Sequence, residues 1–186
     1  QGRDVWLEQP SLSGKENYVV PNTCREEEAA RILAMERSEI RRRLGWEDEE
    51  FAVVCVASVQ PRKGQDVLVD AVSNISAVAP NLRVHLVGSD DGEWANSLKD
   101  SVDERDLQER IEFHGERDDA LELIHAADLL VQPSRAEAFG LTLLEAMVLE
   151  TPIAASCVGG MPEVLDEGKA GSLFEPESPE DLTSVL

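Results

Sequence analysis

The sequence is poor in aromatic residues and contains no long apolar run. Aromatic residues make up 4% of the chain and hydrophobic residues 42%, so its core must be built mainly from aliphatic side chains. No run approaches the roughly 20 apolar residues of a membrane-spanning helix. The first ten residues lack the basic and apolar regions of a signal peptide. A cytoplasmic protein is expected, with peripheral attachment of the full-length protein to the inner membrane as the alternative.

Positive charge is also scarce. The chain of 186 residues has 17 Lys and Arg against 38 Asp and Glu, which gives a formal net charge of −21. This excess of acid argues against a nucleic-acid partner or an anionic membrane surface, because both require a basic face. An acid-rich, lysine-poor surface is expected of a halophilic protein, since salt screens the repulsion between its charges. An ordinary acidic surface is the alternative.

Cysteine is rare, and two common nucleotide-binding motifs are missing. Cys24, Cys55 and Cys157 do not have the spacing of a metal site. Two of them fall in predicted strands, so buried reduced thiols are expected. There is no G-x-G-x-x-G after the first predicted strand and no G-x-x-x-x-G-K-[ST] in the chain, which disfavours dinucleotide dehydrogenases and P-loop NTPases. No metal and no cofactor is expected.

Short apolar runs alternate with segments of helical periodicity from residue 51 onward. They predict six strands with helices between them. The continuous run FAVVCVA at 51–57 predicts a strand buried on both faces. The alternating run at 82–86 predicts a strand nearer the edge, with His85 on a partly exposed face. The pattern as a whole predicts an α/β fold with a Rossmann-like, doubly wound parallel sheet.

The ends of the chain suggest how the domain is bounded. Residues 1–24 are interrupted by glycine, proline and serine, and we interpret them as a connector from a missing N-terminal domain. Residues 25–44 predict one charged helix that ends at Gly45. Residues 25–186 are expected to form a single domain, and its last helix, which opens at 179–182, is expected to be cut short.

The loops after the strands carry the candidate site, because ligands of such sheets bind outside the carboxyl ends of strands. Arg62 and Lys63 follow the first strand, and two adjacent cations there suggest that a diphosphate is neutralised. An exposed pair at a helix start is the alternative. His114 ends the third strand at the same edge, where a base or phosphate contact and a structural role are both open. His125, within a predicted helix, is expected to be structural.

The stretch at 128–145, DLLVQPSRAEAFGLTLLE, is the most informative part of the sequence. It predicts a buried strand, a polar loop and a helix that starts near residue 139. The first backbone N–H groups of such a helix can bind a phosphate, and Gly140 lets a ligand approach them closely. Glu137 and Glu145 beside an anion site would repel it unless they bind something else. Sugar hydroxyls are the candidate.

Six segments, in collinear order, resemble the donor-binding C-terminal domain of retaining GT-B glycosyltransferases of the family 4 type. The strongest segment is E-x7-E, from Glu137 to Glu145, followed by VGGMPE. VVPN at 19–22 also resembles the segment that leads into this domain. The six segments are VASVQPRKGQDVLVDA, LRVHLVG, IEFHGE, AADLLVQPSRAEAFGLTLLEAM, TPIAASCVGGMPEVL and GKAGSLFEPESPEDL.

The resemblance implies transfer of a sugar, with retention, from a nucleoside-diphosphate sugar to an acceptor. It implies that Lys63 contacts the donor diphosphate, Glu137 the donor sugar and Glu145 the ribose. The base would lie near residues 113–117. Further contacts with the donor are implied by the family's helix start and the following glycine turn, at Phe139, Gly140, Leu141 and Gly160.

One position departs from the pattern of the family. Many members have a Gly-Arg pair where this chain has Ala57 and Ser58, so the usual second cation for the diphosphate is missing unless Arg62 replaces it. Ser58 therefore supports an alternative in which the chain is a non-catalytic nucleotide-sugar-binding or assembly module. Another GT-B enzyme, such as a starch-synthase-like transferase or a sugar-nucleotide epimerase, is a further alternative.

In this family the N-terminal domain supplies the acceptor site and part of the catalytic cleft. The resemblance therefore implies that this chain binds a nucleotide sugar weakly and transfers nothing by itself. The acceptor, a saccharide or a lipid, and the donor base and sugar stay open.

Overall fold

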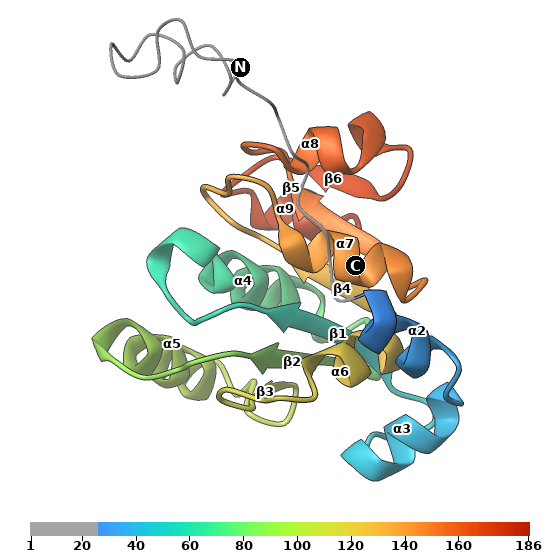
Figure 1. Ribbon diagram of the computed structural model, residues 1–186. Coiled ribbons are helices and arrows are strands. Elements are labelled where there is room, and N and C mark those ends of the chain that lie inside the picture. The colour runs from blue at the N-terminus through green and yellow to red at the C-terminus, as the bar shows by residue number, and fades with distance from the viewer. Residues whose placement is uncertain (1–25) are drawn as a thin grey trace, which may run out of the picture.

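The computed structural model describes residues 26–186 and shows a six-stranded sheet between two layers of helices (Figure 1). All neighbouring strands are parallel, in the order β3-β2-β1-β4-β5-β6. The predicted connector at 1–24, with its VVPN segment, lies outside the described residues. The strands are β1 Phe51–Val56, β2 Leu82–Val87, β3 Ile111–Phe113, β4 Leu129–Gln132, β5 Ile153–Ser156 and β6 Ser172–Phe174.

The chain enters the sheet near its middle and is wound to both sides. From β1 it passes to β2 and β3, then returns to β4 beside β1 and continues to β5 and β6. This is the strand order of a Rossmann-like doubly wound sheet, so the predicted fold class is confirmed. The winding reverses between β1 and β4, and the loops after these two strands therefore leave in opposite directions around a crevice.

Three helices cover one face of the sheet, namely α4 Gln65–Ile75, α5 Glu93–Glu104 and α9 Pro179–Thr183. Their apolar residues recur at helical spacing, as Val67, Leu68 and Ala71 do in α4. They pack against every second side chain of the strands, such as Val53 and Val131. This layer is built mainly from aliphatic side chains, as the low aromatic content of the chain predicts.

The other face is covered by the remaining helices of residues 26–186, and the strand side chains that point there include Ala52, Val54 and Leu130. Because both faces of the sheet are buried, β1 and β4 are apolar along almost their whole length. Two short 3-10 turns, η1 Pro61–Lys63 and η2 Asp166–Gly168, lie in the loops. The helices of this face are α2 Glu26–Leu33, α3 Arg37–Leu44, α6 Ala120–Ala126, α7 Leu141–Val148 and α8 Met161–Val164.

The prediction of one helix over residues 25–44 is wrong, because the segment forms α2 and α3 with a break between them. Glu36 has an extended backbone there. The break lets α3 present Arg41 to the core, where its guanidinium is 3.1 Å from Asp128 Oδ2 and donates to Glu47 O at 3.0 Å. Arg41 is 8% exposed, so this tertiary ion pair outweighs the helical periodicity of the sequence.

The strand expected nearer an edge, β2, lies inside the sheet between β1 and β3. His85 is therefore not on a partly exposed face but is 3% exposed. Its ring stacks on Trp46, with the ring centroids 4.1 Å apart and the planes tilted by 17°. The alternating pattern of β2 arises because this polar side chain is buried under an aromatic one, a contact that strand periodicity does not reveal.

The two cysteines in the described residues differ from each other. Cys55 is buried in β1, and burial raises the pKa of its thiol to about 12. The sequence predicts a buried thiol at Cys157 as well, but β5 ends at Ser156 and Cys157 is exposed, so that prediction is wrong. Within residues 26–186, no helix combines the length and the apolar character that crossing a bilayer requires.

Candidate functional site

The loops that follow β1 and β4 touch each other across the crevice where the sheet reverses. The amide N–H of Arg135 donates to the carbonyl of Arg62 at 2.9 Å. Gly64, with a φ of +68°, is so close to the second loop that an added Cβ would lie 2.0 Å from Pro133 O. This approach fixes where η1 and its two cations stand relative to the loop that follows β4.

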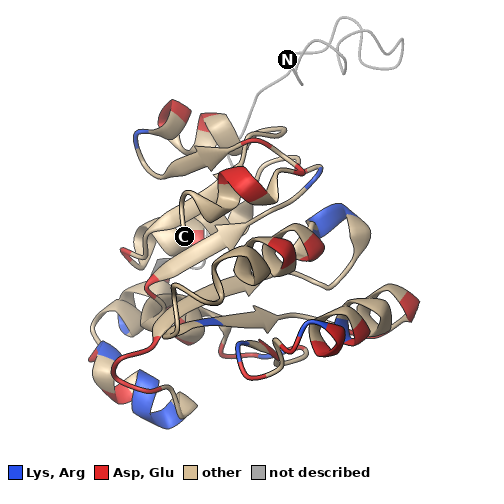
Figure 2. Ribbon diagram, turned by 180° about the vertical axis from the view of Figure 1, so that it is seen from behind, with Lys and Arg blue, Asp and Glu red and all other residues tan. Residues whose placement is uncertain are grey.

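Lys63 and Glu137 meet at this contact. Lys63 Nζ lies 2.6 Å from Glu137 Oε2, and the two side chains are 15% and 14% exposed. Arg62 Nη1 is 3.9 Å from the same carboxylate oxygen and donates to Ala136 O at 2.9 Å. The structure thus brings together three residues that the sequence singled out. In the ribbon of Figure 2, η1 is a blue segment at the start of α4.

The charge state of Glu137 is controlled by this pair. Burial alone would raise the pKa of Glu137, but the hydrogen bond from Lys63, the charge of that lysine, the Ala138 amide and Arg62 together outweigh burial. The pKa of Glu137 is therefore lowered from its ordinary value of 4.5. The site at neutral pH holds an ionised carboxylate beside an ammonium group.

Acidification is expected to destabilise the wild-type chain more than Glu137→Gln. Because the folded-state pKa of Glu137 is lowered, its stabilising contribution is present above pH 4.5 and is lost as the pH falls through the folded-state value. At pH 7 the wild type should melt roughly 2–4 °C higher, for a pair worth about 1 kcal/mol. Thermal melts of both proteins between pH 7 and pH 3 measure this gap, which should close at the acidic end. A gap that stays constant would contradict the prediction.

Arg135 holds the two loops together, and the sequence reasoning did not assign it a role. Its guanidinium binds Asp66 with two hydrogen bonds of 2.8 and 2.7 Å, Pro61 O at 2.7 Å and Glu177 at 2.7 Å. These contacts, with the Asp66 hydrogen bonds foremost, raise the pKa of Arg135. The only available signal was an arginine inside the polar loop after the fourth predicted strand.

The loop after β1 is also held from the side of α4. Gln65 is 1% exposed and donates from Nε2 to Ser58 O at 3.0 Å. Ser58 itself is exposed and lines a hollow of about 320 Å³ between the loops that follow β1, β2 and β3. Arg117 lines the same hollow and is bound to Asp119 by hydrogen bonds of 2.7 and 2.6 Å. The segment predicted to face the base thus borders a hollow at the ligand edge.

The helix after β4 begins two residues later than predicted, at Leu141 rather than Phe139. Gly140 precedes it in the left-handed region, with a φ of 90° and no side-chain cap for the first amides of α7. Only glycine adopts this conformation readily, which explains why the helix cannot extend back to Phe139. Leu141 is 48% exposed, so the start of α7 is open to solvent. An uncapped helix start remains suited to an anion.

The glycine turn after β5 packs directly on the loop that carries Glu137. A Cβ added at Gly159 would lie 1.6 Å from Glu137 O, and one at Gly160 would lie 2.6 Å from Ala138 O. The structure gives Gly160 a packing role, and its predicted contact with the donor stays a prediction. Glu145 is half-buried in the second turn of α7, and its predicted contact with ribose likewise stays a prediction.

The side chain of His114 is largely buried beside the edge strand β3. Its Nε2 lies 3.0 Å from His85 Nδ1, and burial, outweighing the charge of Glu112, lowers the pKa of His114. This contact favours the structural role that the sequence left open for it. His125, 6% exposed in α6, contacts the carbonyl oxygens of Leu149 and Met35, as a structural residue should.

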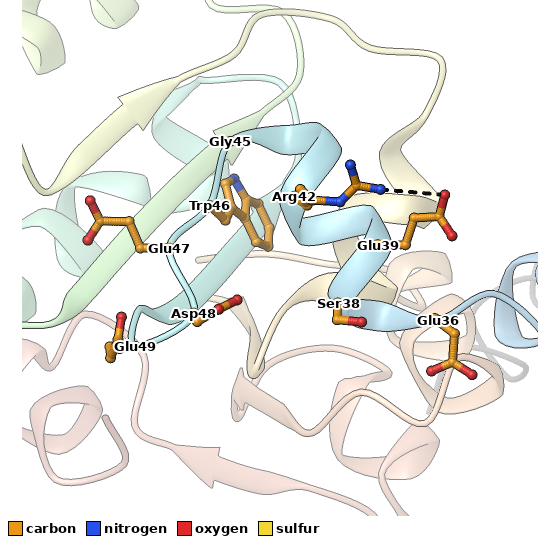
Figure 3. A pocket seen from close by; sticks show the side chains of 9 residues that line it. All are labelled: Glu36, Ser38, Glu39, Arg42, Gly45, Trp46, Glu47, Asp48 and Glu49. Atoms are coloured by element: carbon orange, nitrogen blue, oxygen red, sulfur yellow. Dashed lines mark ion pairs between the residues drawn. The ribbon is translucent and has the colours of Figure 1, made fainter.

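A further hollow, of about 830 Å³, is lined by the side chains drawn in Figure 3. It is formed by α3 and the loop at 45–49, which leads into the amino end of β1. Arg42 is directed toward Glu39, 3.9 Å away, and most of the other side chains are acidic or small. Ligands of doubly wound sheets bind at the opposite, carboxyl end of the strands. The crevice is therefore the better candidate.

The sequence of the chain is similar to sequences of known proteins. The model of the family "Glycosyl transferases group 1" matches residues 36–186. The D-inositol 3-phosphate glycosyltransferase of Mycobacterium marinum is 34% identical over 143 residues, which are 74% of this chain and 30% of that protein. The chain spans less than half of the length of the curated relatives it matches.

Solved structures of similar proteins agree with the fold. Anabaena HepE in complex with UDP and glucose has a TM-score of 0.72 and 30% identity, over 80% of this chain and 40% of that one. Sucrose-phosphate synthase from Thermosynechococcus elongatus has a TM-score of 0.81 and 27% identity, over 98% and 45%. The doubly wound sheet is thus a Rossmann-like domain of the GT-B fold, and the chain belongs to the glycosyl transferases group 1 family.

Proposed function

We propose that this chain is the donor-binding half of a retaining, family 4 type glycosyltransferase. It would bind a nucleoside-diphosphate sugar, from which a hexosyl group passes to an acceptor. The observation that carries this proposal is the contact of Lys63 with Glu137, at 2.6 Å, in the crevice between β1 and β4. The complex of HepE with UDP and glucose, a protein 30% identical to this chain, supports the assignment of the ligand class.

Each group of the crevice has a separate role in the proposed reaction. When the bond between the sugar and the diphosphate breaks, negative charge develops on the leaving phosphate. Lys63 and the uncapped start of α7 would stabilise that charge, which is electrostatic catalysis. The proposal requires no resident metal or cofactor. The carboxylate of Glu137 would bind sugar hydroxyls, and that of Glu145 the ribose of the nucleotide.

The proposed donor must compete for Lys63. In the described structure this lysine is paired with Glu137, so a diphosphate would have to draw the ammonium group away from the carboxylate. Arg62, half exposed and beside the pair, is the cation that would replace the arginine absent at Ser58. The Arg117 that borders the hollow is already bound to Asp119.

The acceptor and the transfer step belong to the longer protein in this proposal. The chain corresponds to 30% of the length of the Mycobacterium marinum relative, so we expect the isolated chain to bind donor weakly and to transfer no sugar. A nucleotide-sugar-binding module without activity is the second candidate, favoured by the neutral, exposed Ser58. The acidic surface would make either protein more stable in concentrated salt.

Glu145→Gln is expected to weaken binding of a nucleoside diphosphate by about tenfold or more, because a charged hydrogen bond to ribose contributes about 1.5–3 kcal/mol. Calorimetric titration with UDP, GDP, ADP and UDP-glucose measures the effect, with and without EDTA to test the need for a metal. Pyrophosphate has no ribose, and its affinity should not change.

The matched control is Glu180→Gln, which removes an exposed carboxylate on α9 and should leave every affinity unaltered. If none of the nucleotides binds at millimolar concentration, the proposed function is wrong. An equal loss of pyrophosphate affinity in Glu145→Gln would instead exclude the ribose contact.

A further inference from the structure

Two histidines and a glutamate come together at the β2–β3 edge, outside the crevice. His85 lies in β2, directly opposite Glu112 in the register of β3. His114 immediately follows β3, two residues after Glu112. Strand side chains two positions apart point to the same face. The sheet therefore places three groups with metal-binding atoms on one face, although they stem from two separate segments.

The three atoms form a nearly regular triangle. His85 Nδ1 is 3.0 Å from His114 Nε2, and Glu112 Oε2 is 3.7 Å from the first and 3.6 Å from the second. The centre of a triangle with these sides lies about 2.0 Å from every corner, which is the usual distance from Zn²⁺ to nitrogen or carboxylate oxygen. An ion could therefore contact all three atoms without rearrangement of the strands.

The other nitrogen of His85 is already held as a metal-bound histidine requires. His85 Nε2 lies 2.8 Å from Glu50 Oε1, and both side chains are less than a tenth exposed. A carboxylate on the outer nitrogen fixes the tautomer in which Nε2 carries the proton, so Nδ1 offers its lone pair to the triangle. The Trp46 ring stacked on His85 prevents rotation of the imidazole.

The triangle is accessible from one side. Glu112 is 64% exposed, whereas the side chains of His85 and His114 are 4% and 10% exposed. A hollow of about 240 Å³ reaches this place and is lined by Glu50, His85 and Glu112. An ion could enter through it and keep a water molecule as a further ligand, as in open zinc sites.

We propose that His85, His114 and Glu112 bind a divalent transition-metal ion such as Zn²⁺, with Glu50 as the outer partner of His85. Two imidazoles favour zinc, cobalt or nickel over magnesium and calcium, which prefer sites made of oxygen atoms. The bound ion would tie β2 to the loop after β3. That loop borders the 320 Å³ hollow of the crevice edge, but the proposal does not depend on the function proposed for the crevice.

The same residues could form only a hydrogen-bonded chain, in which His114 Nε2–H donates to His85 Nδ1 and His85 Nε2–H donates to Glu50. Titration of the EDTA-dialysed 186-residue chain with Zn²⁺ by calorimetry distinguishes the two cases. We expect one Zn²⁺ per chain, a higher melting temperature with Zn²⁺, and visible ligand-field absorption with Co²⁺. A tenfold excess of Mg²⁺ should not displace the zinc.

Variants identify the ligands. Glu112→Gln, at an exposed position where folding is not at risk, should weaken Zn²⁺ binding at least about tenfold, and Glu50→Gln by about 10–100-fold. His114→Ala should abolish both the binding and the rise in melting temperature. Glu109→Gln is the control, because Glu109 lines the same hollow but lies outside the triangle. This variant should bind Zn²⁺ with the affinity of the wild type.

Two results would overturn the proposal. If the wild-type chain takes up no Zn²⁺ at about 100 µM, the cluster is a hydrogen-bonded chain alone. At that concentration a site with a Kd of about 10 µM would be mostly occupied. If Zn²⁺ binds but Glu112→Gln and His114→Ala retain it, the ion is held by other carboxylates of this acidic surface.

Discussion

Lys63→Ala is expected to weaken binding of the preferred nucleoside diphosphate about 30-fold or more, which corresponds to about 2 kcal/mol. The substitution removes the cation proposed to bind the diphosphate. It also leaves the Glu137 carboxylate without the partner 2.6 Å away. Arg62, 3.9 Å from this carboxylate, balances the negative charge less closely, so the carboxylate repels an incoming anion more strongly. Calorimetry with UDP, GDP and ADP measures the loss.

Glu137→Gln tests the same contact in the opposite direction. In this variant Lys63 has no ion pair with residue 137 to break, so the affinity for the nucleoside diphosphate should rise. The additional affinity contributed by the sugar of a nucleotide sugar should fall, because the carboxylate proposed to bind it is gone. Lys169→Ala is the matched control, because Lys169 is 76% exposed and paired only with Asp166 at 3.0 Å among its described ion pairs. If Lys63→Ala and Lys169→Ala behave alike, Lys63 does not bind the diphosphate.

Gly159→Ala is expected to destabilise the fold by about 3 kcal/mol and to lower the melting temperature by roughly 6–12 °C. The left-handed backbone at φ +56° disfavours any side chain, and the added Cβ would lie 1.6 Å from Glu137 O. That distance cannot persist, so the turn after β5 and the loop after β4 must separate. Differential scanning calorimetry measures the shift, and nucleotide affinity should fall with it.

Gly45→Ala separates the two causes of this effect. Gly45 also has a left-handed backbone, at φ +77°, but an added Cβ there meets no atom within 4 Å. Its cost should therefore be only that of the backbone, about 1 kcal/mol, or roughly 2–4 °C. Equal shifts for the two variants would mean that the loops adapt freely and that the packing of Gly159 on Glu137 contributes little.

The sheet could be predicted from the sequence because its pattern is local. Buried parallel strands are apolar along their length, and FAVVCVA and DLLV show this without reference to any partner. The break between α2 and α3 could not be predicted in this way. It depends on a partly buried contact between Arg41 and Asp128, which are 87 residues apart. The burial of His85 under Trp46 is equally non-local.

The candidate site was predicted only in part from the residues themselves. Position at the carboxyl ends of strands singled out Arg62, Lys63 and Glu137, and the structure brings them together. Their separate roles came from the resemblance to glycosyltransferases. Arg135 was overlooked because its partners, Asp66 and Glu177, lie in other segments. The triangle around His114 was missed because strand register, not sequence spacing, brings its members together.

The contacts by which Arg135 holds the two loops together also affect the thermodynamics of donor binding. Because Asp66, Pro61 O and the amide contact with Arg62 already hold both loops in place, their conformational entropy is lost when the chain folds. A ligand that enters later does not have to order them again, and more of its interaction energy appears as affinity. The crevice is in this sense a preorganised receptor, in which the main movement left for binding is the exchange of one lysine between two anions.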